Sequence, residues 1–122
     1  MTQFLPTTRS LHFAEVQIEY RRYQPVVLLE HDNISYPLPS TWSDTVHVFE
    51  HRRRLYVLIV NKKLATVRLD IYAGKEQAAM GSVILVEQEE IEQILGASWQ
   101  KLSPKTMAVL LASQLLRKGG VA

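Results

Sequence analysis

Residues 46–72 read VHVFEHRRRLYVLIVNKKLATVRLDIY, and this stretch decides the fold. At its centre, Leu55–Val60 carries an apolar or aromatic side chain at every position, as expected for a central strand that is covered on both faces. On either side, Val46–Glu50 and Leu64–Tyr72 alternate apolar with polar residues, which indicates half-buried strands. Two short basic connections join the three segments, so we predict consecutive strands linked by hairpin turns.

The last of these strands has a clear period of two. Val67, Leu69 and Ile71 share one face, which we predict to point inward. Arg68 and Asp70 share the other face, which we predict to point outward into solvent.

The basic residues of this stretch concentrate in the turns that flank Leu55–Val60. Arg52–Arg54 precede that strand, and Lys62–Lys63 follow it. Because a strand rises about 3.3 Å per residue, we expect the two basic turns to lie at opposite ends of the strand, roughly 20–25 Å apart.

Three more strands are predicted upstream. Val16–Tyr20 alternates apolar with polar residues, and Val26–Glu30 is a short apolar run. A His-Asp-Asn turn then leads into Ile34–Leu38. Pro37 and Pro39 have no N–H group to donate to a ladder, so we expect this strand at the edge of its sheet.

The chain changes character after Tyr72. Small and polar residues at 73–81 predict a connection with room for one helical turn at Glu76–Met80. Ser82–Val86 predicts one more strand. Glu87–Leu95 has the pattern of a helix whose acidic residues lie early, where the helix dipole favours them.

A second helix is predicted to begin at Ser103-Pro104, a capping residue followed by proline at the first helical position. Gly119-Gly120 predicts its end. This helix is apolar on more than one face, and its apolar residues include Leu110, Leu111 and Leu115. We expect the helix to pack against the sheet as a lid; the alternative is that a second apolar face binds a partner protein or a second copy of the chain.

These elements predict a single α+β domain over residues 1–122. A small, bent antiparallel sheet or an SH3-like β-barrel should occupy residues 12–72, and residues 82–122 should form a mostly helical C-terminal part. A chain of 122 residues is too short to bury two useful cores.

The composition excludes several classes of protein. Hydrophobic residues make up 47% of the chain and charged residues 21%, which is typical of a globular domain and not of a disordered one. Because cysteine is absent, disulfides and thiolate metal sites are excluded. No signal peptide or membrane-spanning stretch is visible, so we expect a cytoplasmic protein.

No catalytic or metal-binding motif emerges. Of the four histidines, His47 and His51 are four residues apart, but they fall on a predicted strand, where this spacing does not align two ligands. The chain has no Gly-x-Ser-x-Gly element, and Gly74-Lys75 lacks the context of a phosphate-binding loop. We therefore expect no enzymatic activity, no metal and no cofactor.

The basic turn at Arg52–Arg54 is the most functional-looking feature of the sequence. Clusters of Lys and Arg bind nucleic-acid phosphates, although such a turn also serves solubility or protein contact. The predicted nucleic-acid-binding residues are Arg52, Arg53, Arg54, Lys62, Lys63, Arg68, Arg21 and Arg22.

A partial resemblance points in the same direction. The matching elements are Tyr36–Pro39, Val46–Val48, the turn His51–Arg54, the strand Leu55–Val60 and Leu64-Ala65 at the start of the last strand. In this order they resemble the small β-barrel that follows the catalytic core of Mu-type and IstA-type transposases, over about residues 26–70. The resemblance implies a barrel that helps to hold DNA or a neighbouring subunit. The acidic catalytic core of those enzymes has no counterpart here, so it implies no strand transfer.

The preferred hypothesis is a non-enzymatic accessory protein that binds nucleic acid, DNA more than RNA, through this basic turn. The alternative is a small adaptor or inhibitor that docks on another protein through the helix face of Leu110, Leu111 and Leu115, with a homodimer as one form of that contact. A self-associating structural subunit is a third possibility. None of these functions requires a membrane.

Overall fold

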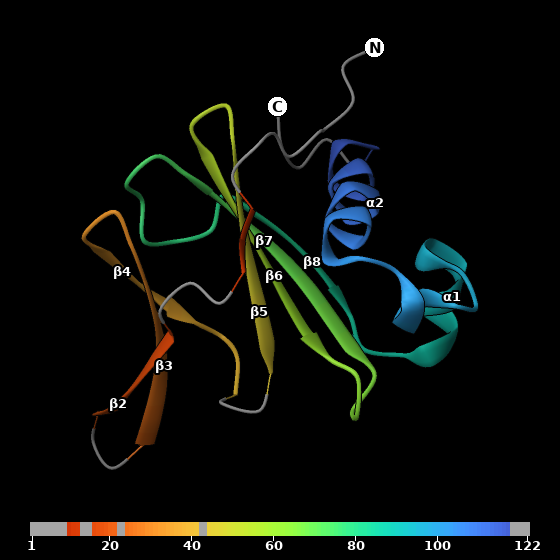
Figure 1. Ribbon diagram of the computed structural model, residues 1–122, viewed down its shortest axis with the longest axis horizontal. Coiled ribbons are helices and arrows are strands. Elements are labelled where there is room, and N and C mark those ends of the chain that lie inside the picture. Colours follow the sequence, from red (N-terminus) through yellow and green to blue (C-terminus); the bar gives the residue numbers. More distant parts are fainter. Residues whose placement is uncertain (1–9, 13–15, 22–23, 42–43, 118–122) are drawn as a thin grey trace.

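The computed structural model describes residues 10–12, 16–21, 24–41 and 44–117 in three layers (Figure 1). A small antiparallel sheet packs on one face of a larger one, and helices cover the other face of the larger sheet. The described elements are β1 (Ser10–His12), β2 (Val16–Arg21), β3 (Gln24–His31), β4 (Ile34–Leu38), β5 (Thr45–His51), β6 (Arg54–Asn61), β7 (Thr66–Ala73), β8 (Gly81–Leu85), α1 (Gln88–Leu95), the 3-10 turn η1 (Trp99–Lys101) and α2 (Pro104–Arg117).

Strand β6 is the centre of the five-stranded sheet, whose order is β1-β5-β6-β7-β8. Its alternate side chains enter two different cores. Leu55, Val57 and Ile59 pack towards the small sheet. Tyr56, Leu58 and Val60 pack towards the helices. The prediction of a strand covered on both faces is therefore confirmed, and it explains why this segment has no polar position.

The small sheet has the order β2-β3-β4, with β4 at its edge as the prolines predict. Buried side chains from β3 and β4, including Leu29 and Tyr36, face the large sheet. The rings of Tyr36 and Tyr72 meet edge to face, with their centroids 5.0 Å apart. This contact joins the two sheets directly.

The C-terminal helices close the other face. The backbone N–H of Thr106 donates to Ser103 Oγ at 3.2 Å, so Ser103 caps α2 as predicted. Leu111 is fully buried in the core between the large sheet and the helices, which we call the helix-side core. Trp99, on the short η1 turn, is 1% exposed and packs in the same core. The prediction that α2 acts as a lid is confirmed. No helix within the described part of the chain is long and apolar enough to cross a membrane.

The α+β class is confirmed, but the strands that the structure describes form two sheets and not one closed barrel. The division falls between β4 and β5. Pro37 and Pro39 lack N–H donors, which suits β4 to the edge of the small sheet. The chain then enters the large sheet with β5. The connection after β7 contains turns and bends but no helical turn at residues 76–80.

The prediction that Asp70 points into solvent is wrong. Its side chain is fully buried, because the second face of β7 is covered as well. Arg68 Nε donates to both carboxylate oxygens at 2.9 and 3.0 Å, and Ser82 Oγ donates at 2.6 Å. These bonds offset the cost of burying the charge.

Leu58 tests the helix-side core. Leu58→Ala removes a fully buried side chain from the central strand, so it should lower the free energy of unfolding by about 2–5 kcal/mol. Urea denaturation followed by circular dichroism measures this change. Lys63→Ala, at an exposed position of the next turn, is the control and should stay within about 0.5 kcal/mol of wild type. A loss below 1 kcal/mol for Leu58→Ala contradicts the packing described.

Candidate functional site

Two hairpin turns, one from each sheet, lie at the same end of the molecule. Asp32 and Asn33 join β3 to β4 with φ of 51° and 64°, and Arg52 and Arg53 join β5 to β6 with φ of 49° and 63°. Two-residue loops with both residues at positive φ are type I′ turns, whose twist matches that of the flanking strands. Because the sheets are stacked, the two turns become opposite walls of one pocket.

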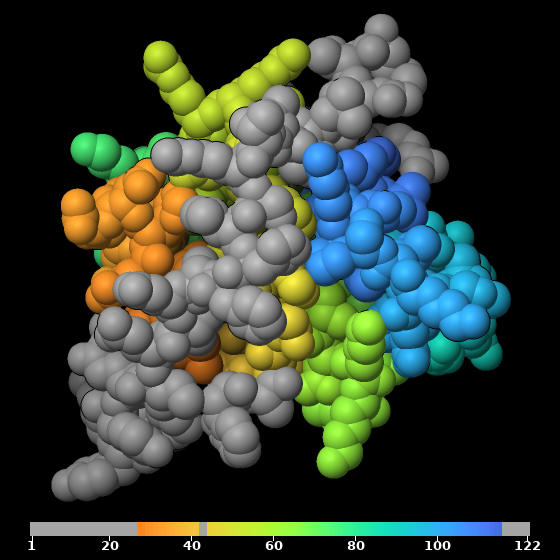
Figure 2. All heavy atoms as spheres, viewed as in Figure 1, coloured from red at the N-terminus to blue at the C-terminus, as the bar shows by residue number. Residues whose placement is uncertain are grey.

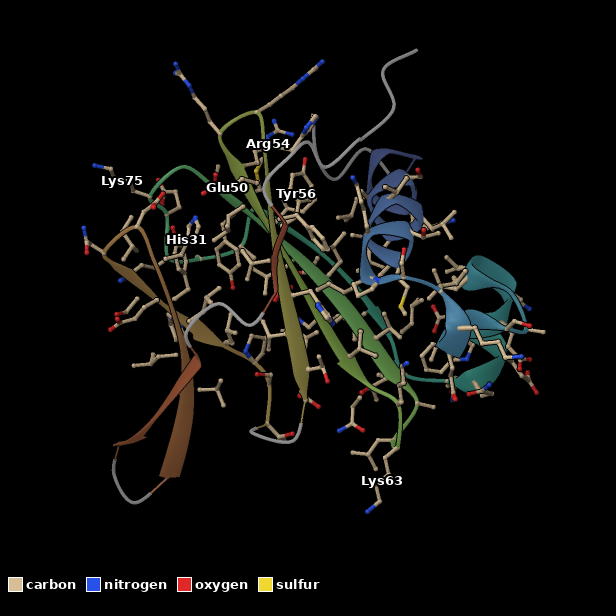
Figure 3. All side chains as sticks on the ribbon, in the orientation of Figure 1. His31, Glu50, Arg54, Tyr56, Lys63 and Lys75 are labelled. Atoms are coloured by element: carbon tan, nitrogen blue, oxygen red, sulfur yellow. The ribbon has the colours of Figure 1, made fainter. Side chains whose placement is uncertain are left out.

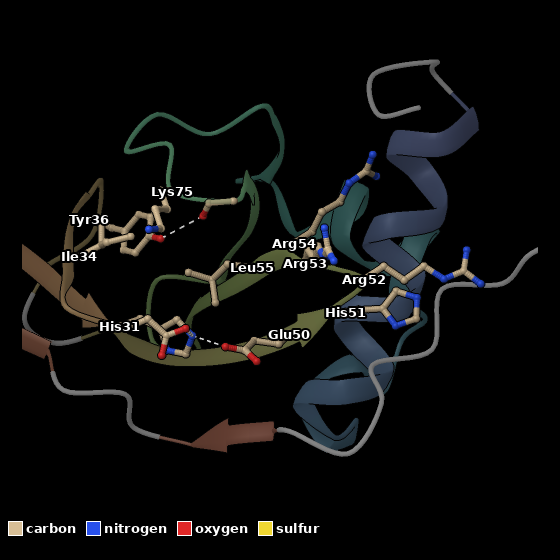
Figure 4. A pocket seen from close by; sticks show the side chains of 12 residues that line it. His31, Ile34, Tyr36, Glu50, His51, Arg52, Arg53, Arg54, Leu55 and Lys75 are labelled. Atoms are coloured by element: carbon tan, nitrogen blue, oxygen red, sulfur yellow. Dashed lines mark hydrogen bonds and ion pairs between the residues drawn. The ribbon is translucent and has the colours of Figure 1, made fainter.

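This pocket has a volume of about 440 Å³, which is within the usual range for small-ligand sites. Figure 4 shows an apolar floor at Leu55, with His31 and Glu50 on one side and arginines on the other. The lining residues are His31, Asp32, Ile34, Tyr36, Glu50, His51, Arg52, Arg53, Arg54, Leu55, Gly74 and Lys75.

The β7–β8 loop ties the two walls together. The backbone N–H of Gly74 donates to the carbonyl of Arg53 at 3.3 Å. Tyr36 Oη donates to the carbonyl of Gly74 at 3.4 Å, and Gln77 Nε2 donates to the carbonyl of Ser35 at 3.0 Å. The φ of Gly74 is +59°, a conformation that glycine adopts without strain. The loop therefore holds the basic turn and the small sheet in a fixed relation.

A polar cluster joins the two walls of the pocket. His31 Nε2 is hydrogen-bonded to Glu50 Oε1, and Asp32 Oδ2 lies 3.5 Å from the same nitrogen. The side chain of His31 is 10% exposed, that of Glu50 27% and that of Asp32 73%. No pattern in the sequence indicated this cluster, since it joins β3 to β5 across two sheets. The turn signal at residues 31–33 was visible, but nothing in the sequence paired it with Glu50.

The backbone of the arginine turn is strained. Asp and Asn tolerate the left-handed conformation, so the β3–β4 turn is ordinary. Arginine does not, and each left-handed arginine costs roughly 1–2 kcal/mol. Arg52 and Arg53 are nevertheless exposed, and the side chains of this turn project from the surface in Figure 2. Backbone strain of this kind concentrates at functional sites.

The other predicted basic residues do not join Arg52 and Arg53 in one surface. Lys63 is exposed in the turn at the far end of β6 (Figure 3), as predicted. Its neighbour Lys62 donates from Nζ to the carbonyl of Gln100 at 2.9 Å. Arg68 is bound to Asp70 in the middle of the sheet. Arg54 shares the pocket but hydrogen-bonds the Tyr56 side chain. Arg21 ends strand β2, and Arg22 lies outside the described residues.

The helix residues predicted as a partner interface lie in or against the core. Leu111 and Leu115 are 0% and 5% exposed, and Leu110 is partly buried against the same cluster. An exposed partner surface made of these three side chains is therefore a wrong prediction. The helix is apolar on more than one face because it packs against the large sheet and α1 together.

Burial and neighbouring charges alter the acid–base properties around the pocket. Burial, followed by the charge of Arg52, lowers the pKa of His51 below its usual range. Burial raises the pKa of Tyr36, and the charges of Asp32 and Glu50 raise it further. Burial also raises the pKa of Tyr72 to about 12. The tyrosines at this end of the interface between the sheets are therefore neutral near pH 7.

Comparison with family models, curated proteins and solved structures finds no match to this chain. The geometry of the pocket and the chemistry of its residues therefore carry the functional argument.

The strained turn gives a direct stability test. The double variant Arg52→Asn/Arg53→Gly supplies the pair that type I′ turns prefer, so it should raise the free energy of unfolding by about 1–2 kcal/mol. The control, Asp32→Asn/Asn33→Gly in the unstrained turn, should gain less. Both are measured by urea denaturation. An arginine-turn variant less stable than wild type would show that the turn is not strained.

His51 gives a pH test. Its pKa is lowered in the folded protein, so the unfolded chain takes up the proton more readily. Stability that this residue contributes above about pH 6.5 is therefore lost as the pH falls below that value. His51→Gln should show a shallower loss of stability between pH 7 and 5 than wild type, measured from urea midpoints. If the stability of wild type and of His51→Gln depended on pH equally between pH 7 and 5, the lowered pKa of His51 would be refuted.

Proposed function

We propose that this protein is a non-enzymatic accessory factor that binds nucleic acid through the arginine turn at the mouth of the pocket. The observation that carries the proposal is the pair Arg52 and Arg53, exposed and held in left-handed conformations at a hairpin tip. A turn selected for folding alone would carry Asn-Gly at these positions. Two arginines at this energetic cost indicate selection for their guanidinium groups.

The chemistry of the turn suits a phosphate backbone. Guanidinium groups donate two parallel hydrogen bonds to phosphate oxygens and stay charged at any physiological pH. Lys75 adds a third cation from the facing loop. Such contacts position a protein on the nucleic-acid backbone without reading the base sequence. We therefore expect binding to nucleic acid with no preference for a base sequence. The partial resemblance to a transposase barrel favours DNA over RNA.

The proposed contact is smaller than the full set of basic residues in the sequence. It consists of Arg52, Arg53 and Lys75, with Arg54 behind them. Lys62 and Lys63 lie at the opposite end of β6. They can contact phosphates elsewhere on a long nucleic-acid chain, but not the few phosphates that the arginine turn contacts. Arg68 is occupied by Asp70 and is not part of the proposed contact.

Fluorescence anisotropy with labelled single- and double-stranded DNA and RNA tests the proposal. Wild type should bind DNA at low salt, and its affinity should fall steeply as salt is added. Arg52→Asn/Arg53→Gly should weaken binding and lower the salt slope by about 2, since each phosphate contact contributes about 1. Because this variant is expected to be more stable than wild type, loss of binding cannot be attributed to misfolding.

Lys62→Ala/Lys63→Ala is the matched control, because it removes the same charge from the other end of the strand. It should retain most of the affinity for a short oligonucleotide. Equal losses in the two double variants would show that net charge, and not the arginine turn, determines binding. No binding by wild type even at low salt would refute the proposed function.

A further inference from the structure

The cluster of His31, Asp32 and Glu50 has the composition of a metal site. We propose that it binds one divalent transition-metal ion of the zinc or manganese class, through His31 Nε2, Asp32 Oδ2 and Glu50 Oε1. This inference does not depend on nucleic-acid binding, because its three residues are not among the proposed phosphate contacts and it needs no partner.

The positions of the donor atoms fit such an ion. One ligand atom from each residue lies within 4.8 Å of those of the other two, and His31 Nε2 is 3.5 Å from Asp32 Oδ2. Two ligand atoms that each lie about 2.1 Å from a tetrahedral ion are about 3.4 Å apart. The histidine and the aspartate therefore already have the separation of two metal ligands. A small rotation of the Glu50 side chain, away from its hydrogen bond to His31, completes the set.

A hydrogen bond explains only part of this cluster. It joins His31 to Glu50, while Asp32, the next residue in the chain, brings a third donor to within 3.5 Å of the same nitrogen from a side chain that is 73% exposed. Asp32 and Glu50 each place a carboxylate oxygen beside the same ring nitrogen of His31. One nitrogen and two anionic oxygens therefore converge, which is a donor set that a divalent ion can use.

The donor set also selects the class of ion. Imidazole nitrogen favours zinc, iron, copper or nickel over magnesium or calcium, and carboxylates extend the range to manganese. Three protein ligands leave open positions on the ion, and the cluster lines the 440 Å³ pocket. In Figure 4, Arg52 lies at the far end of the pocket from His31, and Glu50 lies between them.

Isothermal titration calorimetry of the full chain with ZnCl₂, MnCl₂ and MgCl₂, without nucleic acid, tests the site. Wild type should bind one Zn²⁺ per chain, more tightly than Mg²⁺. Asp32→Asn is the decisive variant, because asparagine tolerates the positive φ of this turn and the fold is kept. It should weaken Zn²⁺ binding at least about tenfold. His31→Gln should abolish it.

Glu30→Gln is the matched control, since it removes an exposed carboxylate one residue from His31 on the same strand. It should bind Zn²⁺ as wild type does. Stoichiometric Zn²⁺ binding that Asp32→Asn and His31→Gln leave unchanged would overturn the proposal and assign the ion to another site. Absence of Zn²⁺ binding by wild type would also overturn it. A rise in the thermal midpoint on adding Zn²⁺ to wild type, absent in Asp32→Asn, would support it independently.

Discussion

Burial of β6 on both faces is the constraint on which the rest of the structure depends. A strand with apolar side chains on both sides cannot be stable in a single solvated sheet, because one row would remain in water. Each fully buried Leu, Ile or Val is worth about 1.5–3 kcal/mol, and β6 presents such residues in both directions. The chain therefore has to supply two covers. The helices provide one, and the small sheet provides the other.

The pocket follows from that arrangement. Two stacked sheets whose hairpins turn back at the same end bring their tips together, and the space between the tips is closed by the β7–β8 loop. The polar residues of the pocket also come from both sheets. The small sheet contributes His31 and Asp32, and the large sheet contributes the arginines together with Glu50. Each sheet alone would present only half of the site.

The short strand β1 was not predicted. Patterns of apolar residues predicted β2 to β8, and the Ser103 cap predicted the start of α2. They did not predict which sheet each strand joins, because alternation shows which residues share a face but not what covers that face. Asp70 illustrates the limit: its position reads as solvent-facing, and only the layer above it makes it buried. The pairing of His31 with Glu50 was hidden for the same reason. The arginine turn was visible from its charge, but its strain appeared only with the backbone angles.

The hydrogen bonds of Gly74 have a mechanical consequence. Its N–H reaches the Arg53 carbonyl and its own carbonyl accepts from Tyr36, so one peptide unit on each side of this residue links the basic turn to the small sheet. A displacement of either wall strains the same short connection. Any ligand that shifted one wall would act on the other through this connection, and linkage makes such an effect on affinity equal in both directions.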